Sequence, residues 1–183
     1  YLNTQPWTYG WKSNKDVVYG HWNLDISKTL ISNQTDIEER LPFEIFNVWK
    51  IINSKVFGNK AVLTRCYANR HTFGTEGYIH TDSERSNDHT VVVYMNEEWK
   101  PEWGGETIFY KPTNYEIIDA YLPKYGRVVH FPGYMPHKAS ALSRVCPEVR
   151  TTLMFKVNMD VILEEGEEMK LVSFLREIGS YKV

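Results

Sequence analysis

Apolar residues recur at intervals of three and four between positions 42 and 57, and this spacing predicts an amphipathic helix. The residues of this stripe are Phe43, Ile45, Phe46, Trp49, Ile52 and Val56. Pro42 suits the first helical turn, because its fixed backbone angle is already helical and no N–H donor is needed there. Gly58 is expected to end the helix, since glycine readily adopts the left-handed conformation that often follows the last turn.

After Gly58 the pattern changes to short runs of β-branched and aromatic residues, separated by Gly, Pro, Asn and Asp. Such runs between turn residues are typical of an all-β sandwich or barrel. Strands are predicted near residues 61–67, 77–81, 90–95, 106–110, 127–131 and 150–157. Turn residues support two of these starts, because Gly104-Gly105 precedes the fourth run and Gly126 precedes the fifth.

The two ends of the chain differ in what they predict. Residues 161–178 carry apolar side chains such as Leu171 and Phe174 among acidic residues, which predicts a second helix that Gly179 ends. We expect this helix to pack outside the β core. Residues 1–41 are rich in Trp, Tyr and Asn and show no sustained period, so they predict no defined element.

The length of 183 residues and a hydrophobic content of 42% suffice for one domain with a substantial core and are too small for two. We therefore predict a single α+β domain over residues 1–183. Residues 61–157 would form its β core, and the predicted helices at 42–57 and 161–178 would flank that core.

Charge and cysteine content narrow the classes of partner and compartment. Twenty-one basic and 23 acidic residues are spread along the chain and give a net charge of -2, so no nucleic-acid partner is expected. Cys66 and Cys146 fit neither a disulfide framework nor a zinc pattern, which favours a reducing, cytoplasmic location. No apolar run approaches the roughly 18 residues of a membrane span. Because the chain begins with Tyr1 rather than Met, we expect an upstream segment.

The sequence His80-Thr81-Asp82 carries the first candidate chemistry. In a strand, residues two apart point to the same side, so His80 and Asp82 can converge on one ion. His137, which follows a Pro- and Gly-containing loop, is the expected third ligand. Two imidazoles and one carboxylate on one face of an ion, with the other face open, are typical of non-haem Fe(II) oxygenases.

The other histidines lack this spacing. His130 lies in an apolar run and is interpreted as a core residue with satisfied hydrogen bonds, with a role as replacement iron ligand as the alternative. His21, His71 and His89 have no spaced partner, so we expect them on the surface or beside the ligands rather than on the metal.

Several further motifs occur in a fixed order along the chain. They are Cys66-Tyr67, Gly77-Tyr78-Ile79-His80-Thr81-Asp82, Val93-Tyr94-Met95-Asn96-Glu97-Glu98-Trp99, Gly104-Gly105-Glu106-Thr107, Gly126-Arg127-Val128-Val129-His130-Phe131-Pro132, His137 and Arg150-Thr151-Thr152-Leu153. A His-x-Asp triplet alone has little specificity, but the ordered set is specific. From about residue 62 to residue 157 the chain resembles the prolyl 4-hydroxylase branch of the 2-oxoglutarate and Fe(II) dependent oxygenases.

This resemblance implies a fold, a reaction and its cosubstrates. The expected fold is a double-stranded β-helix, or jelly roll, with flanking helices. The expected enzyme is a dioxygenase that uses Fe(II), 2-oxoglutarate and O2, with ascorbate as a supporting reductant. It would hydroxylate an unactivated C–H bond, with a prolyl residue of a peptide or protein as the leading acceptor, and release succinate and CO2. Because Asp82 occupies the carboxylate position that related halogenases lack, hydroxylation is favoured over halogenation.

The resemblance also implies a basic anchor for the distal carboxylate of 2-oxoglutarate, one strand after the last histidine ligand. Arg150 matches this position, and its planar guanidinium suits a carboxylate bidentately. On a strand, Arg150, Thr152 and Met154 would face the same interior as the iron. The interval from His137 to Arg150 is longer than in relatives, so Arg144 is the alternative anchor.

Two tyrosines complete the implied cosubstrate pocket. By resemblance, Tyr67 and Tyr94 would line it, and Thr107 could contribute; the alternative is that both tyrosines are ordinary aromatics of a sheet core. The polar run 83–89 is interpreted as a solvated loop, or as a substrate flap because it follows the ligands.

Two other functions compete with prolyl hydroxylation. The first is a 2-oxoglutarate oxygenase that acts on a free amino acid or another small molecule. The second, from another class, is a non-catalytic jelly-roll binding module with a vestigial metal site. An intact ligand set together with Arg150 argues against the second function.

Overall fold

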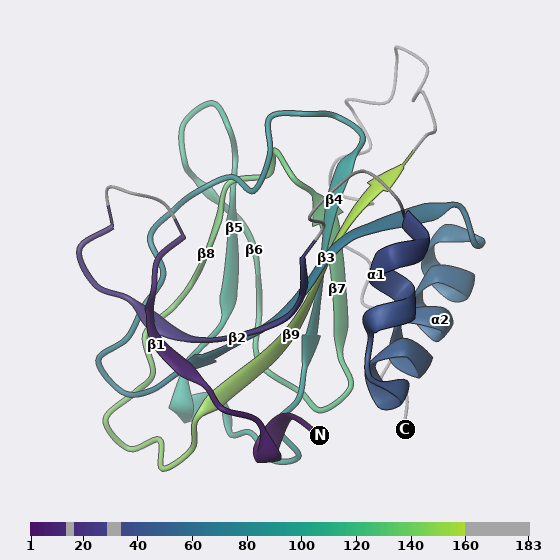
Figure 1. The fold of residues 1–183 in the computed structure, drawn as a ribbon. Helices are drawn as coiled ribbons and strands as arrows, with labels where there is room; N and C mark the ends of the chain where they lie inside the picture. The colour runs from purple at the N-terminus through teal and green to yellow at the C-terminus, as the bar shows by residue number, and fades with distance from the viewer. Residues whose placement is uncertain (14–16, 29–33, 160–183) are drawn as a thin grey trace.

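Two antiparallel sheets face each other, and two helices pack on the outer face of the larger sheet (Figure 1). The computed structural model describes residues 1–13, 17–28 and 34–159. The predicted helix at 161–178 lies outside the described residues. Neither described helix has the length and apolar character that crossing a membrane requires.

The larger sheet has six strands. In spatial order they are β1 (Thr8–Trp11), β2 (His21–Lys28), β3 (Ala61–His71), β9 (Arg150–Met159), β4 (Asp88–Tyr94) and β7 (Val128–Pro132). The smaller sheet has three strands, in the order β6 (Ile117–Tyr121), β5 (Thr107–Tyr110) and β8 (His137–Ala139). The two helices are α1 (Gln34–Arg40) and α2 (Phe43–Phe57), and short 3-10 turns occur at Leu2–Thr4 and Pro101–Trp103.

Helix α2 confirms the prediction made from its apolar stripe. It begins after Pro42 and ends at Gly58, whose φ of 59° is left-handed. Trp49, which is 1% exposed, packs against Phe155 of β9. Its indole N–H also donates a hydrogen bond of 2.8 Å to Glu38 of α1, so one side chain joins both helices to the sheet.

Side-chain alternation along β9 separates the hydrophobic core from a polar interior. Leu153 and Phe155 belong to the core under the helices. Arg150, Thr152 and Met154 line a cavity on the opposite face of the same strand, as the strand period predicts. The inner face of the larger sheet therefore presents polar groups to the space between the sheets.

Most of the predicted strands are present, but the one expected at 77–81 is wrong. This segment runs beside β8 with only intermittent pairing, and His80 forms an isolated bridge with His137. Five elements were not predicted, namely β1, β2, α1, β6 and β8. β8 has three residues, and α1 has seven, which is too short to develop a clear period.

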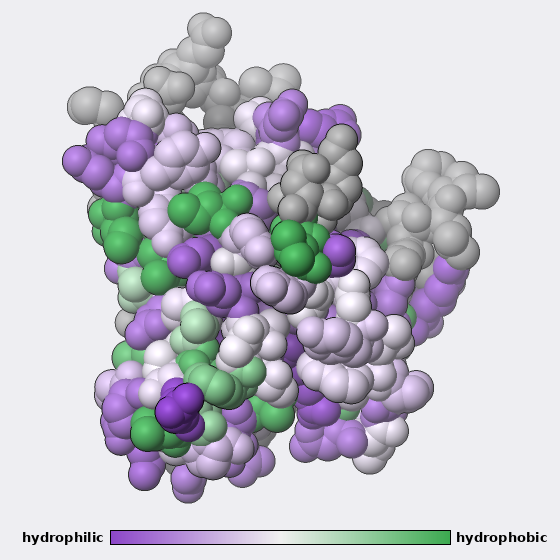
Figure 2. All heavy atoms as spheres, turned by 90° about the vertical axis from the view of Figure 1, so that its left-hand side faces the viewer, coloured by the Kyte–Doolittle hydropathy of each residue, from purple (hydrophilic) through white to green (hydrophobic). Residues whose placement is uncertain are grey.

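The surface at the left of Figure 1 is chemically mixed. Figure 2 shows this face, where hydrophobic side chains form small separate patches among polar ones. Among the exposed large hydrophobic residues are Tyr9 and Trp22. Their rings contact each other edge to face, with ring centres 5.2 Å apart. No broad apolar surface appears on the described part of this face, so this face shows no sign of a large apolar interaction site.

Candidate metal centre

A cavity of about 410 Å³ lies between the two sheets. Strands β3, β9 and β4 contribute one wall, and residues of the 77–83 segment and β8 contribute the other. This volume falls in the range of about 300–1,000 Å³ that is usual for small-molecule sites. Five of the residues that the sequence singled out line this cavity, namely Tyr67, His80, Asp82, His137 and Arg150.

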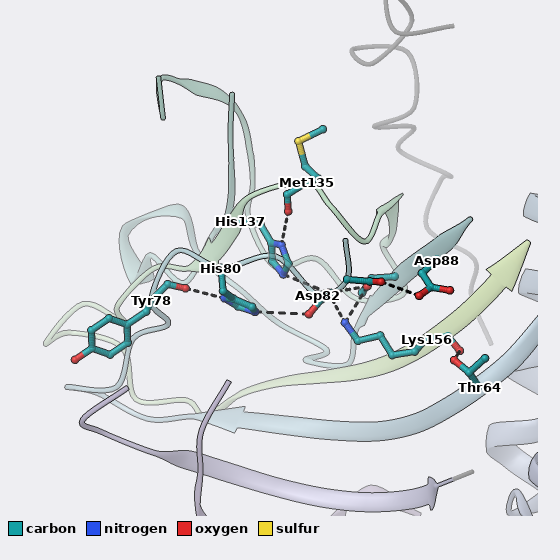
Figure 3. Close-up of polar contacts among 10 residues, drawn as sticks. Thr64, Tyr78, His80, Asp82, Asp88, Met135, His137 and Lys156 are labelled. Atoms are coloured by element: carbon teal, nitrogen blue, oxygen red, sulfur yellow. Dashed lines mark hydrogen bonds and ion pairs between the residues drawn. The ribbon is translucent and has the colours of Figure 1, made fainter. Parts of the chain in front are cut away.

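His80, Asp82 and His137 converge in this cavity, as predicted (Figure 3). Each offers one donor atom, and these atoms lie within 4.8 Å of one another. The Nε2 atoms of His80 and His137 lie 3.7 and 3.6 Å from oxygens of the Asp82 carboxylate. With bonds of about 2.0–2.2 Å, adjacent donors on one ion lie about 3 Å apart. The three groups are therefore close to the spacing that one ion requires.

Backbone carbonyls orient both imidazoles. Nδ1 of His80 lies 2.7 Å from the Tyr78 carbonyl oxygen, and Nδ1 of His137 lies 2.9 Å from that of Met135. A carbonyl can only accept, so each Nδ1 carries a proton, and each Nε2 faces Asp82. Burial lowers the pKa of His137 to about 4, so this imidazole is neutral at neutral pH. The two imidazoles and the carboxylate fit Fe(II) in donor type.

Main-chain hydrogen bonds fix the segment that carries the first two ligands. The amides of His80 and His137 each donate to the other residue's carbonyl at 3.0 Å. The Asp82 amide donates to the Gly133 carbonyl at 2.8 Å. A Cβ at Gly133 would lie 3.0 Å from both the Asp88 carbonyl oxygen and the Ser83 Cβ, so this close approach favours glycine. The ligand segment and the loop before β8 are thus packed backbone to backbone.

Lys156 of β9 lies beside the carboxylate of the set. Its ammonium contacts Oδ2 of Asp82 and donates to the Thr90 hydroxyl at 2.9 Å, while that hydroxyl donates to Oδ2 at 2.6 Å. Burial alone would raise the pKa of Asp82, but the nearby Lys156 and His137 hold this pKa below its ordinary range. Lys156 is not among the residues predicted from the sequence, although it continues the alternation of Arg150, Thr152 and Met154.

Arg150 and Arg144 have different surroundings. Arg150 is 3% exposed and lines the cavity, whereas Arg144 is exposed and does not line it. Arg150 donates from Nε to the Gly105 carbonyl at 2.7 Å and from Nη2 to the Thr107 hydroxyl at 2.9 Å. A guanidinium has five N–H donors, so donors remain for a ligand.

The tyrosines occupy different positions. Tyr67 lines the cavity as expected, whereas Tyr94 is not among the residues that line it. The ring of Tyr94 lies 5.3 Å from the Arg150 guanidinium, and its hydroxyl lies 2.6 Å from the Thr107 hydroxyl and 3.0 Å from the Tyr121 carbonyl. Tyr94 therefore supports Arg150 and Thr107 from behind, rather than forming the cavity wall itself.

The remaining histidines are not part of the ligand set. Nε2 of His130 lies 2.8 Å from Nδ1 of His89, and burial lowers the pKa of His130 to about 3. Its interpretation as a replacement ligand is wrong for the described residues, because the only metal-holding group there is His80, Asp82 and His137. His21, His71 and His89 are buried and line the cavity, so a surface position is also wrong for them.

Comparison with known proteins identifies the family. The model of the 2OG-Fe(II) oxygenase superfamily matches residues 64–157, about half of the chain. The chain belongs to this superfamily. The name of the superfamily states the requirement for 2-oxoglutarate and Fe(II), and the His80, Asp82 and His137 set provides suitable donors for the metal.

Solved structures of this superfamily share the fold. A 2OG-Fe(II) oxygenase family oxidoreductase from Burkholderia pseudomallei is 16% identical, with a TM-score of 0.61, over 85% of this chain and 74% of that one. A prolyl hydroxylase from Trichoplax adhaerens, in complex with a hypoxia inducible factor peptide fragment, is 15% identical, with a TM-score of 0.56. The match covers 87% of this chain and 73% of that one. A Pseudomonas putida prolyl-4-hydroxylase is 18% identical, with a TM-score of 0.51. The match covers 76% of this chain and 69% of that one.

At these identities the likeness shows the fold, which is the predicted double-stranded β-helix. The search of curated proteins gives no match.

Proposed function

We propose that this protein is a 2-oxoglutarate-dependent dioxygenase in which His80, Asp82 and His137 hold Fe(II). The observation that carries the proposal is the convergence of these three donors in the cavity that Arg150 also lines. When bound, Fe(II) supplies the redox chemistry that couples decarboxylation of 2-oxoglutarate by O2 to hydroxylation of an acceptor C–H bond. One oxygen atom enters succinate, the other enters the acceptor, and CO2 leaves.

Hydrogen bonds to the three proposed ligands orient them before a metal binds. The carbonyls of Tyr78 and Met135 fix the two imidazoles, so the lone pairs face one point before a metal arrives. Thr90 hydrogen-bonds Oδ2 of Asp82 and limits rotation of that carboxylate. Orientation by such outer contacts reduces the reorganisation that metal binding requires.

Arg150 is the proposed anchor for the distal carboxylate of 2-oxoglutarate. It is buried and charged, and it keeps N–H donors beyond those used by Gly105 and Thr107. A carboxylate paired with a buried guanidinium gains a charge-assisted bond of high strength. Tyr67, which lines the same cavity, is proposed to hydrogen-bond the cosubstrate with its phenol, and Tyr94 to position Arg150.

A prolyl residue in a peptide or protein is the first acceptor that we propose. Support comes from the ordered motifs and from a structural neighbour that is a prolyl hydroxylase in complex with a peptide fragment. A free amino acid or another small molecule is the second candidate, favoured by positive charge in the cavity. A non-catalytic binding module would not need three preoriented donors beside a buried cation.

Release of succinate tests the proposed function. Purified protein is incubated with Fe(II), ascorbate, O2 and 2-oxoglutarate, with and without a library of prolyl peptides, and both succinate and a one-oxygen mass gain are measured. We expect wild-type protein to release succinate even without acceptor, and His80→Ala to release none. Absence of succinate under all these conditions would refute the enzymatic function.

A further inference from the structure

Arg65 of β3 is a cation in the metal cavity to which the proposed reaction assigns no role. Its guanidinium contacts two aromatic rings, with Cζ 4.8 Å from the centre of the Trp11 ring and 4.4 Å from that of the Tyr67 ring. Nε and Nη2 of Arg65 are buried and have no hydrogen-bond partner among the described residues. Such unpaired buried donors are rare in folded proteins, and because Arg65 also lines the cavity, its positive charge attracts an anionic group bound there.

A β-bulge directs Arg65 into the cavity. The register between β3 and β9 shifts between Leu63 and Arg65. Leu63 and Cys66 belong to the core under the helices, whereas Thr64 and Arg65 both line the cavity. A regular strand would alternate, so the extra residue is what aims the guanidinium inward.

Lys156 lies directly across from Arg65 in the paired strands. Directly opposite residues of an antiparallel pair point to the same side, and like charges in such a pair destabilise the sheet. The Lys156 ammonium is paired with Asp82. The positive charge of Arg65 is thus placed beside another cation inside a cavity, which is an arrangement suited to an anionic ligand.

The sum of the charges in the cavity also favours an anionic ligand. Among the described residues, the charged side chains that line the cavity are Arg65, Arg150, Lys156, Asp82 and Asp88. The three cations exceed the two carboxylates by a single positive charge. Because Fe(II) and 2-oxoglutarate carry opposite double charges, their joint binding leaves this excess unchanged. The loaded site therefore keeps one more cation than it has anions, which favours an acceptor that places a carboxylate beside that cation.

Arg65 and Arg150 lie at opposite ends of the cavity floor. Arg150 and Lys156 are six residues apart on β9, which corresponds to about 20 Å along an extended strand. Arg65 pairs with Lys156, and Lys156 contacts Asp82 of the ligand set. With Arg150 as the anchor of 2-oxoglutarate, Arg65 remains for a ligand on the other side of the metal ligands.

We propose that the acceptor is a small molecule with a carboxylate, and that Arg65 binds this carboxylate beside the metal site. This inference rests on the proposed dioxygenase function and selects the second of its two candidate acceptors over the prolyl residue of a peptide. A prolyl residue inside a peptide has no carboxylate of its own, whereas a free amino acid such as proline does. Contacts with the rings of Trp11 and Tyr67 restrict the guanidinium before a ligand binds.

Calorimetry on the loaded protein tests this proposal without turnover. Protein with Fe(II) and 2-oxoglutarate, kept free of O2, is titrated with the free amino acids, with their carboxamides and with neutral prolyl peptides. We expect at least one carboxylate to bind and its carboxamide to bind far more weakly. In Arg65→Gln the affinity for that carboxylate should fall by a factor on the order of 10–100.

Arg70→Gln is the matched control. Arg70 is on the same strand and also stacks on an aromatic ring, that of Trp7, but it does not line the cavity. Its removal should leave acceptor affinity unchanged. Arg65→Lys keeps the charge and loses the planar fork, so it should weaken binding less than Arg65→Gln and provides a second variant if Arg65→Gln does not fold.

Two outcomes would overturn the inference. The first is that no carboxylate binds, or that carboxamides or neutral prolyl peptides bind as tightly as the carboxylates. The second is that folded Arg65 variants bind the carboxylate as wild-type protein does. Succinate release without acceptor is measured on the same samples, so a failed acceptor site with active 2-oxoglutarate turnover is distinguished from a failed enzymatic function.

Discussion

At the scale of single residues, the position of an arginine relative to the cavity decides what it can bind. Arg150 reaches the cavity because it opens β9 and points to the inner face of the sheet. Its Nε and one Nη atom are held by Gly105 and Thr107, which fixes the plane of the guanidinium. A fixed plane loses less conformational entropy when a carboxylate binds than a mobile side chain does.

Substitution of the two candidate anchors tests this difference. Arg150→Ala should raise the dissociation constant for 2-oxoglutarate by about 10-fold or more, because a buried charge-assisted pair is lost. Arg144→Ala should leave it unchanged, since Arg144 is exposed and outside the cavity. The constants are measured by calorimetry on Fe(II)-loaded protein without O2. Equal effects, or a larger effect of Arg144→Ala, would rule out Arg150 as the anchor.

The sequence predicts the metal ligands better than it predicts their surroundings. Local spacing is enough to pair His80 with Asp82, and the ordered motifs add His137 and Arg150. Lys156 and Arg65 have no such local signal, because their roles depend on contacts across the sheet. The bulge that turns Arg65 inward is a property of the pairing between β3 and β9, whose partners are about half the chain apart.

At the scale of elements, α2 owes its position to a few large side chains. Trp49 is 1% exposed and contacts Phe57 and Phe155, while Phe43 on the same helix is 75% exposed. The apolar stripe of the helix predicts α2 but does not separate these two residues. Only the contact with the sheet shows which aromatic residue contributes to the core.

A pair of alanine substitutions measures that contribution. Trp49→Ala should lower the free energy of unfolding by about 3–5 kcal/mol, because it leaves a large cavity and removes the hydrogen bond to Glu38. Phe43→Ala should change it by less than about 0.5 kcal/mol, as expected for an exposed side chain. Denaturant unfolding of both variants provides the values. Similar losses in the two variants would contradict the assigned packing of α2.

The edge elements show where prediction from sequence stops. β8 consists of His137–Ala139, so it is defined by its pairing with β5 rather than by a period of its own. The 77–81 segment has strand-like residues, yet it pairs at only a few positions with β8. Hydrophobic period identifies long elements, whereas short edge strands depend on a partner that is distant in sequence.

At the scale of the whole molecule, several histidines are buried as neutral groups. Burial lowers the pKa of His21 to about 4 and that of His130 to about 3. In the unfolded chain a histidine has a pKa of about 6.5, so the unfolded state binds protons at a higher pH than the folded state. The stability contributed by neutral burial is complete above pH 6.5 and is lost progressively as the pH falls toward 3–4.

Unfolding of the metal-free protein at several pH values tests this linkage. Between pH 7.5 and pH 5, each of these two histidines should lower the free energy of unfolding by up to about 2 kcal/mol. His130→Gln removes one titrating group and should reduce the pH dependence relative to wild-type protein. A free energy of unfolding that stays constant or rises as the pH falls would contradict the neutral burial of these side chains.

The fate of O2 tests the central claim, that this cavity carries out 2-oxoglutarate-dependent oxygenation, most directly. Protein with Fe(II) and 2-oxoglutarate is supplied with isotopically heavy O2, and the succinate formed is analysed by mass spectrometry. The proposed reaction predicts succinate that carries a single heavy oxygen atom, in wild-type protein and not in His80→Ala. Unlabelled succinate, or the same labelling in His80→Ala, would contradict it.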